Sequence, residues 1–578
     1  MSLVRLPLLL TALAAAAPPA VIFHVIVDDL GWADTGYHAP QTGADAGVQT
    51  PRMDALAAEG VLLDRVYVYH MCTPSRSSFL SGRLPVHVEV ALPNPENPNQ
   101  GVPRKMTAIA RKLKEQGMQT HVVGKWCVHS ARAPLHAQAG ATHAPPLSSP
   151  PFVSAPGRDL GMATYDHTPK GRGFDSSLIY FEHKVDYFTQ QIAQSSCMQY
   201  NPATVDLWAH SPAEPEGPAR ALNGTAYAEY LFRDRVLDII AAHDPAKGAL
   251  YLQYDPHIAH CPLQVPRDWL ARFNYSDDET ACSAQTASIF PGSGPADYRC
   301  RNQYHAMVAL LDEVLGNVTD AIKAKGWWDQ TLMVLHSDNG GPIDIAESAS
   351  NNLPLRGGKY SKFEGGIRAN AFASGGYLPA AVRGTTNAGI IHVADFYSTY
   401  CGLAGGEHAA CAADAPAAAA GLPPPDSLDV WPLLSGAAAA SPRTEVPIDI
   451  TGKSRALIQG RWKLLTGPQS VAGWQGKTYP NASTPAHDPN AQSHACGAGC
   501  LFDVEADAGE HVDVAAANPD IVAAMSARLD ALAPSFYSNN ETGTDAPLCA
   551  GKPAGMPCAC FFAQPGNVWD GFFGPYQV

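Results

Sequence analysis

The sequence predicts an α/β fold: a large, mostly parallel sheet flanked by helices, followed by a smaller C-terminal unit. Short apolar, β-branched runs alternate with helical patterns, as in sheets whose parallel strands are joined by crossover helices. Four of these runs lead into charged, amide or imidazole side chains. Near 404–441 the composition turns to alanine, proline and glycine, which indicates a surface connection and a domain boundary. We therefore expect a first domain at 21–440 and a second at 441–578.

The first two strands precede residues capable of chemistry. The run VIFHVIV at 21–27 is typical of a buried strand and leads directly into Asp28 and Asp29. A helix is predicted over 50–60, because this segment begins with a threonine cap, has proline in its first turn and ends at glycine. The strand-like run THVV then leads into Lys125.

Two further strands follow the same pattern. The run ALYLQY leads to His257 and His260, and the run TLMVLH leads to Asp338 and Asn339. Between them, an amphipathic pattern over 300–325 predicts a long helix. Because ligands bind at the carboxyl ends of strands in open α/β sheets, we expect these polar residues to converge. The alternative is that they merely begin loops.

The second domain is predicted to hold a small antiparallel sheet. The stretches RALIQGRWKLLTG and CLFDVEADAGEHVDVA indicate strands, and a helix is expected near 518–532. We find no internal repeat.

Length, charge and the N-terminus limit the classes of protein. The 578 residues suffice for two or more domains, and a net charge of -15 argues against a general nucleic-acid or anionic-membrane binder. Residues 1–20 combine one arginine, a short apolar run and small residues, which is typical of a cleaved signal peptide. A buried core segment is the alternative. No later segment has the length and apolarity of a membrane span.

Cysteines and sequons are consistent with an exported protein. The thirteen cysteines fit an oxidising compartment, and local bridges are suggested for Cys282 with Cys300, Cys401 with Cys411, Cys496 with Cys500, and within the trio Cys549, Cys558 and Cys560. Their spacing does not fix the connectivity, and a zinc site is the less favoured reading. Five N-x-S/T sequons begin at Asn223, Asn274, Asn317, Asn481 and Asn540.

The segment CTPSRSSFLSGR, from Cys72 to Arg83, resembles the sulfatase signature C-x-P-S-R with its S/T-G-R ending. The resemblance continues through VDDLGWADTGYH, RGFD, HCPLQVP, HSDNGG and PLRGGKYSKFEGGIR, and it covers essentially the whole mature chain. It is closest to the arylsulfatase B type, the N-acetylgalactosamine-4-sulfatase group. This resemblance implies the alkaline-phosphatase-like α/β fold with a small C-terminal domain.

The resemblance also implies that Cys72 is oxidised to formylglycine by a formylglycine-generating enzyme. Once hydrated, the aldehyde is a geminal diol, so one hydroxyl can attack sulfur while the second later allows sulfate to leave. A serine ester lacks that exit and needs water to attack sulfur instead. The implied mechanism is covalent catalysis with a built-in release step.

The polar strand ends provide ligands for a cation. Asp28, Asp29, Asp338 and the Asn339 amide form an all-oxygen set that suits one Ca²⁺ ion, with Mg²⁺ less favoured. By resemblance, the ion also contacts the diol at Cys72 and a sulfate oxygen. For the acidic pair alone, a turn or helix cap is the alternative interpretation.

The remaining site residues are assigned by resemblance. Arg76, Lys125 and Lys359 match positions that hold the diol and the sulfate, whose negative charge requires fixed cations. His260 matches the position that protonates the leaving oxygen, with His257 as its nearby rival. Two further cations, Lys362 and Arg356, are expected to be salt-bridged or solvated neighbours.

One departure concerns the family motif G-K-W-H-L-G. Here GKW runs into a low-complexity stretch, and removal of 127–158 would join GKW to DLG. We interpret 127–158 as an insertion, such as a retained intron, which places Asp159 where the family has a histidine. The alternative is a genuine surface loop in which Cys127 or His129 substitutes. A transcript that encodes the whole stretch would refute the intron hypothesis.

These observations predict a calcium-dependent sulfatase acting on a sulfated carbohydrate or aryl sulfate. The predicted location is the secretory pathway, with an extracellular or lysosome-like destination. A phosphate or phosphonate monoesterase on the same scaffold is one alternative. An inactive, sulfatase-like glycoprotein that binds sulfated polysaccharide is another.

Overall fold

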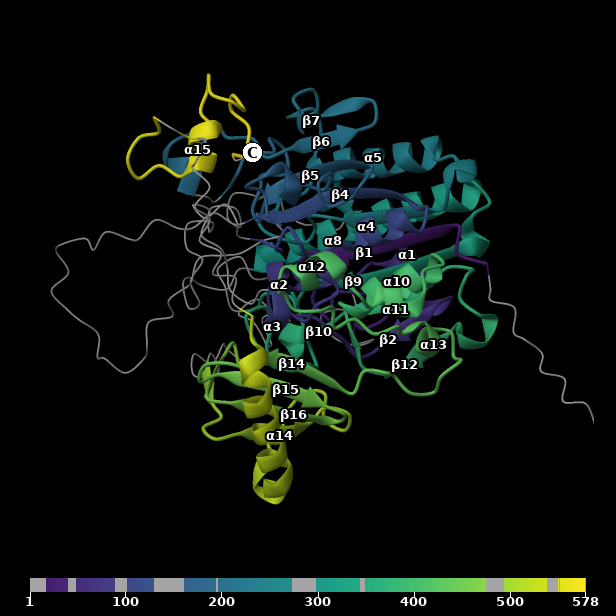
Figure 1. Cartoon of the computed structure of the whole chain (residues 1–578), viewed down its shortest axis with the longest axis vertical. Coiled ribbons are helices and arrows are strands. Elements are labelled where there is room, and N and C mark those ends of the chain that lie inside the picture. The colour runs from purple at the N-terminus through teal and green to yellow at the C-terminus, as the bar shows by residue number, and fades with distance from the viewer. Residues whose placement is uncertain are drawn as a thin grey trace, which may run out of the picture.

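A computed structural model describes residues 17–39, 48–88, 101–128, 161–193, 196–272, 298–343, 349–474, 493–537, 549 and 551–576. Its centre is a mixed sheet of ten strands (Figure 1). In spatial order these are β12 (Thr385–Asn387), β2 (Val61–Leu63), β11 (Ala371–Ser374), β9 (Thr331–Ser337), β1 (Val21–Val27), β8 (Leu250–Asp255), β4 (Gln119–Val128), β5 (Ser176–Glu182), β6 (Trp208–Ser211) and β7 (Glu214–Pro218). A short sheet of β10 (Arg368–Ala369), β3 (Val66–Tyr67) and β13 (Ile391–His392) lies apart from it.

The middle of the large sheet is parallel, as predicted. Strand β1 pairs in parallel with both β8 and β9, and β4 pairs in parallel with β8 and β5. The antiparallel strands β11, β6 and β7 lie outside this centre. Every residue of β1 is buried, because helices cover both faces of the sheet. The predicted strands at 21–27, 120–123, 249–254 and 331–336 are therefore confirmed.

Two helical layers enclose the sheet. Helices α1 (Pro51–Ala58), α5 (Ala228–Ala242), α6 (Arg267–Arg272) and α8 (Tyr298–Ala324) pack on one face. On the other lie α2 (Cys72–Ser81), α3 (Pro85–Val88), α4 (Ile109–Glu115) and α10 (Asp395–Leu403). Alternate residues of β1 pack into the hydrophobic cores on the two faces of the sheet. Ile22 and Ile26 face α2 and α10, whereas Phe23 and Val25 face α8.

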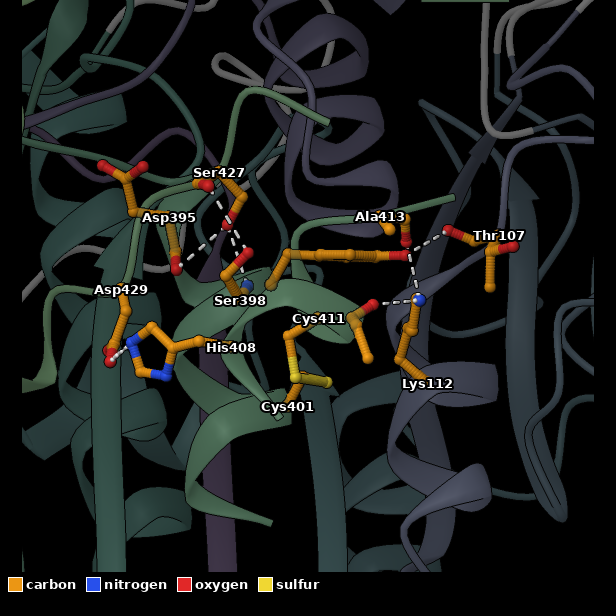
Figure 2. The surroundings of a disulfide bond; sticks show 12 residues. Thr107, Lys112, Asp395, Ser398, Cys401, His408, Cys411, Ala413, Ser427 and Asp429 are labelled. Carbon is orange, nitrogen blue, oxygen red and sulfur yellow. Dashed lines mark hydrogen bonds and ion pairs between the residues drawn. A yellow bond between two sulfur atoms is a disulfide. The ribbon is translucent and has the colours of Figure 1, made fainter. Parts of the chain in front are cut away.

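The alanine-rich segment after α10 is more ordered than the expected surface connection. It forms the short helices α11 (His408–Cys411), α12 (Ala415–Ala419) and α13 (Trp431–Leu434). Figure 2 shows that the Cys401–Cys411 disulfide and Lys112, which donates to the carbonyl of Ala413, tie this segment to the large domain. The alanine and proline content of this segment does not predict these contacts, because they depend on distant parts of the chain.

The small antiparallel sheet is present as predicted. Its order is β14 (Glu445–Asp449), β15 (Arg455–Gln459), β16 (Trp462–Thr466) and β19 (Cys500–Asp503), and α14 (Pro519–Leu532) packs on β15 and β16. Beside it β17 (Pro468–Ser470) pairs with β18 (Ser493–Ala495). Figure 1 shows this unit below the large sheet.

The C-terminal tail lies against the large sheet, not on the small one. Helix α15 (Cys558–Phe562) is tied to the large domain by the Cys197–Cys560 disulfide, and Phe573 donates a backbone hydrogen bond to Val205 (Figure 1). Within the tail trio, Cys549 pairs with Cys558 as the suggested local bridge, whereas Cys560 pairs with the distant Cys197. Spacing could not reveal a partner so far along the chain. The bridges Cys401–Cys411 and Cys496–Cys500 form as expected.

Several sequence features lie outside the described residues. They include most of the predicted signal peptide, Asp159, His129, Cys282, Asn274, Asn481 and Asn540. Of the other sequons, Asn223 lies in a turn and Asn317 in α8, and both are partly exposed. Within the described part of the chain, no helix combines the length and hydropathy that a membrane span requires.

Candidate active site

The carboxyl ends of β1 and β9 bring four polar side chains together. They are Asp28 and Asp29 after β1, and Asp338 and Asn339 after β9. The backbone N–H of Asp29 donates to Asp338 Oδ1 at 3.2 Å, and Asn339 Nδ2 donates to Asp29 Oδ1 at 2.7 Å. Asp29 has a positive φ of 55°, a conformation that acidic residues tolerate better than bulky ones and that turns the chain sharply off the strand. All four residues are buried, so this edge of the sheet forms one acidic cluster.

Each buried carboxylate is paired with a buried cation from another element. Lys125 Nζ, from β4, lies 2.6 Å from Asp28 Oδ2, and Arg76 Nε, from α2, lies 2.9 Å from Asp338 Oδ2. Lys359 Nζ lies 2.7 Å from Asp29 Oδ1. Gly124 makes the approach of β4 to β8 feasible, since a Cβ there would lie 1.9 Å from the Asp255 carbonyl oxygen.

Burial and pairing have opposite effects on these acids. Burial holds the pKa of Asp28 well above its ordinary value, although Lys125 opposes the shift. For Asp338 burial also favours the neutral acid, but Arg76 and the two lysines outweigh it and lower the pKa. Burial would lower the pKa of Lys359, yet Asp29 raises it well above the ordinary value. The site therefore holds opposite charges in a water-poor environment, where their interactions are strong.

Two oxygen atoms indicate that the cluster fits a cation. Asp28 Oδ1 and Asn339 Oδ1 are both buried, and neither accepts a hydrogen bond from the part of the chain that the structure describes. Such atoms are costly to bury unless another group satisfies them, and carboxylate and amide oxygens are the ligands that Ca²⁺ prefers. Ligand atoms of Asp28, Asp29 and His260 also lie within 4.8 Å of one another. The donor set therefore fits a hard divalent ion.

A second ligand-like group does not fit a metal. His494, Cys496 and Cys500 lie close together, but the two sulfur atoms form a disulfide and cannot act as thiolate ligands. This agrees with the sequence-based interpretation, which favoured disulfides over a zinc site for these cysteines.

Cys72 begins α2 and is partly exposed. Its electrostatic interactions with Asp29 and Lys359 place it beside the acidic cluster. Ser75 holds the turn that precedes the helix, because its hydroxyl accepts from the Tyr69 N–H at 2.9 Å and donates to the Met71 carbonyl at 3.0 Å. The serine of the motif therefore shapes the backbone around Cys72.

The two histidines after β8 differ in their surroundings. His260 Nδ1 lies 2.7 Å from the Cys261 carbonyl oxygen and so carries the proton, which leaves Nε2 facing Asp29 Oδ2 at 3.6 Å. His257 stacks on Tyr187, with ring centroids 4.1 Å apart. Burial, then Lys125, holds the pKa of both imidazoles well below the ordinary value. Of the two, His260 contacts the acidic cluster.

The loop that carries Lys359 is held by the small domain. The Arg356 guanidinium lies 4.0 Å from the Phe363 ring centroid and 4.4 Å from that of Trp474, and its Nε donates to the Ala472 carbonyl at 2.7 Å. Tyr360, with a positive φ of 72°, donates its N–H to the His70 carbonyl. Arg356 is thus a buried clamp and not the expected salt-bridged or solvated neighbour. Lys362, by contrast, pairs with Asp449 as expected.

Sequence reasoning missed Asp255 at the end of β8. Its Oδ2 lies 3.7 Å from Arg76 Nη1 and accepts from Gln253 Nε2 at 2.7 Å. Burial raises the pKa of Asp255 to about 7. The same signal that identified the other acids, a polar residue directly after a buried strand, also applies here.

The matched family model is described as Sulfatase and covers residues 20–406. Arylsulfatase J of Mus musculus is 29% identical over 541 residues, which cover 89% of this chain and 76% of the relative. Arylsulfatase A of Homo sapiens is 25% identical over 588 residues, which cover 95% of this chain and 97% of the relative. N-acetylgalactosamine-6-sulfatase of Mus musculus is 24% identical over 405 residues, covering 68% and 64%.

Solved structures share the fold. The crystal structure of Ps i-CgsB in complex with k-i-k-neocarrahexaose matches with a TM-score of 0.62 at 21% identity, covering 90% of this chain and 94% of that chain. The phosphonate monoester hydrolase of Agrobacterium radiobacter matches with a TM-score of 0.50 at 15% identity, covering 90% and 96%.

The large mixed sheet and the clustered acids and cations define an alkaline-phosphatase-like hydrolase fold with a charged site at its strand ends. The chain belongs to the sulfatase family, and it is a sulfuric ester hydrolase. The arylsulfatase B subtype stays a prediction, since the relatives above carry the names arylsulfatase J, arylsulfatase A and N-acetylgalactosamine-6-sulfatase.

Proposed function

We propose that this sulfatase depends on calcium and uses formylglycine, made from Cys72, to remove sulfate from a carbohydrate or aryl alcohol. The observation that carries the proposal is the pair of buried oxygens without hydrogen-bond donors, Asp28 Oδ1 and Asn339 Oδ1, beside the start of α2. Asp28, Asp29, Asp338 and Asn339 would hold the ion. When bound, it would polarise the sulfate ester and favour deprotonation of the nucleophile.

The cations of the site would bind the ester. Arg76, Lys125 and Lys359 each pair with one of the three candidate ion-ligand carboxylates, so a divalent ion would add positive charge to this group. A sulfate ester is an anion, and a positive site shielded from water stabilises the charge that develops on its oxygens. As formylglycine, residue 72 would supply a geminal diol, with one hydroxyl as nucleophile and the second to permit sulfate release.

His260 would protonate the leaving oxygen. Its Nε2 is the unprotonated ring nitrogen and faces the cluster, so it can accept a proton there. Burial, Lys125 and Lys359 hold its pKa low without substrate, whereas a bound anion favours the imidazolium. Asp159 stays our proposal for the position of the family's second histidine.

Export to an extracellular or lysosome-like compartment is part of the proposal. The predicted signal peptide supports it, as do disulfides that join distant parts of the described chain. Modification by a formylglycine-generating enzyme would then precede folding.

Mass spectrometry of the peptide that contains Cys72, from protein made in its own host, tests the modification. We expect formylglycine in place of the thiol. An unmodified cysteine would refute the mechanism and favour the inactive, polysaccharide-binding alternative.

The alternative monoesterase activity is favoured only by the fold shared with the phosphonate monoester hydrolase. The sulfate, phosphate and phosphonate esters of one aryl alcohol should be compared at equal concentration. We expect the sulfate ester to react fastest. Faster turnover of the phosphate or phosphonate ester would assign the chain to that class.

A further inference from the structure

A second polar cluster lies beside the candidate active site and has no role in the chemistry above. It consists of His70, Lys362 and Asp449, which we call the rim cluster. Lys362 Nζ lies 2.8 Å from Asp449 Oδ2, and His70 Nε2 lies 3.8 Å from the same oxygen. Among the described residues, neither ring nitrogen of His70 has a partner within hydrogen-bond distance, although the residue is only 9% exposed. A buried imidazole whose facing carboxylate lies beyond hydrogen-bond distance has hydrogen-bonding capacity that a ligand could satisfy.

The rim cluster is attached to the two segments that carry site residues. His70 precedes Cys72 by two positions, so their Cα atoms lie within about 7 Å of one another. Lys362 follows Lys359 in the same loop, and the Tyr360 N–H donates to the His70 carbonyl at 2.8 Å. Asp449 ends β14 and brings the small domain to this position.

The exposure of the side chains places the cluster nearer the surface than the charged pairs of the site. Lys125 and Asp28 are fully buried, and Arg76 and Asp338 are at most 2% exposed. In the rim cluster the side chains of His70, Lys362 and Asp449 are 11, 12 and 16% exposed. Because His70 is two residues from Cys72, the cluster lies within reach of a group attached to a sulfate held at residue 72.

The charges of the cluster favour a neutral, hydroxyl-rich ligand. Asp449 is shared between Lys362 and the Tyr69 hydroxyl, which donates to its Oδ1 at 3.0 Å. Burial would raise the pKa of Asp449, but Lys362 outweighs it and keeps the carboxylate ionised. An additional anion would face this carboxylate, whereas sugar hydroxyls can donate to it and also bond the imidazole.

We propose that His70 and Asp449 form a subsite that hydrogen-bonds the hydroxyl groups of the sugar bearing the sulfate ester, while Lys362, whose ammonium also donates to the carbonyl and hydroxyl of Ser454, holds Asp449 in place. The subsite selects carbohydrate sulfates over simple aryl sulfates, and it rests on the sulfatase function proposed above. The hydroxyls would donate to Asp449 and fill the unused hydrogen-bonding positions of His70. No covalent step is involved.

The test compares monosulfated galactose, N-acetylgalactosamine, glucosamine and fucose with nitrophenyl sulfate as substrates. For Asp449→Asn we expect the ratio of kcat/KM for the preferred sugar to that for nitrophenyl sulfate to fall about 10- to 100-fold, mainly through KM. His70→Gln, which leaves the Lys362 ion pair intact, should lower the same ratio. The matched control is Glu445→Gln, which changes an acid at the start of the same strand that pairs with exposed Arg528.

The outcomes separate the subsite from the activity. Equal losses on both kinds of substrate, or no loss in either variant, would refute the subsite and leave the sulfatase function standing. If the protein hydrolyses nitrophenyl sulfate but none of the four sugar sulfates, the subsite is likewise refuted and the sulfatase function stands. Turnover of no sulfate ester by protein with verified formylglycine would refute the proposed function and the subsite with it.

Discussion

Two arginines of the signature segment have different roles although both are buried against aspartates. Arg76 pairs with Asp338 in the acidic cluster, and Arg83 pairs with Asp414 at 2.9 Å and donates to the Pro423 carbonyl. Arg83 therefore connects α2 to the segment that follows α10, whereas Arg76 faces the candidate ion site. The motif thus encodes both a reactive position and its structural support.

This difference provides a matched pair of variants. Asp338→Asn and Asp414→Asn each break a buried arginine–aspartate pair, so we expect each to lower the free energy of unfolding by about 3–5 kcal/mol. Only Asp338→Asn should also lower kcat about 1000-fold and abolish the rise in Tm on adding calcium. Kinetics and thermal unfolding with and without calcium measure both effects. A calcium response that survives in Asp338→Asn would remove this residue from the ion site.

At the scale of elements, the Lys359 loop depends on the small domain for its shape. The loop has little regular structure of its own, and Arg356 inserts between Phe363 and Trp474 to hold it. Gly357 also donates its N–H to the Gly473 carbonyl at 2.7 Å. The small domain is therefore a support for the site as well as an additional sheet.

Removal of the Arg356 clamp should impair catalysis even though Arg356 acts through the Lys359 loop and not on the substrate itself. For Arg356→Ala we expect kcat/KM to fall about 10- to 100-fold, because displacement of a positioned lysine by an ångström is costly. Arg461→Ala is the control, since Arg461 stacks on Trp462 in the same domain but pairs with Asp503 at an exposed position. Equal activity of the two variants would contradict the clamp. Steady-state kinetics at saturating calcium provide the measurement.

At the scale of the whole molecule, two long-range connections hold the parts together. Cys197 and Cys560 join the tail to the large domain over a sequence separation of 363. Between the large domain and the small sheet, Lys463 lies 3.0 Å from Glu364 and 2.8 Å from Glu510, all fully buried. Neither connection includes a candidate ion ligand, so we expect both to govern stability more than turnover.

The tail disulfide should contribute more stability than a local one. Replacing Cys197 and Cys560 with alanine is expected to lower the free energy of unfolding by about 2–5 kcal/mol. Replacing Cys496 and Cys500, separated by 4 positions, should cost less, because a short loop restricts the unfolded chain less. Chemical denaturation of both variants gives the comparison, and an equal or reversed order would contradict it.

The buried charge network should give a pH-dependent stability. Burial raises the pKa of Glu510 to about 7, with Lys463 opposing and Glu364 reinforcing the shift, whereas the unfolded carboxyl has a pKa of about 4.5. The folded state therefore binds the proton more tightly, and this contribution to stability is lost as pH rises through 7. From pH of about 5 to about 8, Glu510→Gln should gain up to about 3 kcal/mol relative to the native chain. A difference in unfolding free energy that does not change with pH would refute this.

Local sequence patterns were enough to predict the parallel strands and the polar residues near their carboxyl ends. Asp28, Lys125 and Asp338 could be found because a buried strand is a local apolar pattern, and its end is where the next polar residue must appear. The same rule reaches Asp255. The small antiparallel sheet could also be predicted, because its strands are continuous local patterns in the sequence.

Which distant groups meet depends on the packing of the folded chain and could not be predicted from local patterns. The Arg356 clamp, the rim cluster and the Cys197–Cys560 bridge each join segments that no local pattern relates. Their contacts depend on how the small domain and the tail pack against the large sheet. Side-chain periodicity reports which face of an element is buried, but it does not specify what lies against that face.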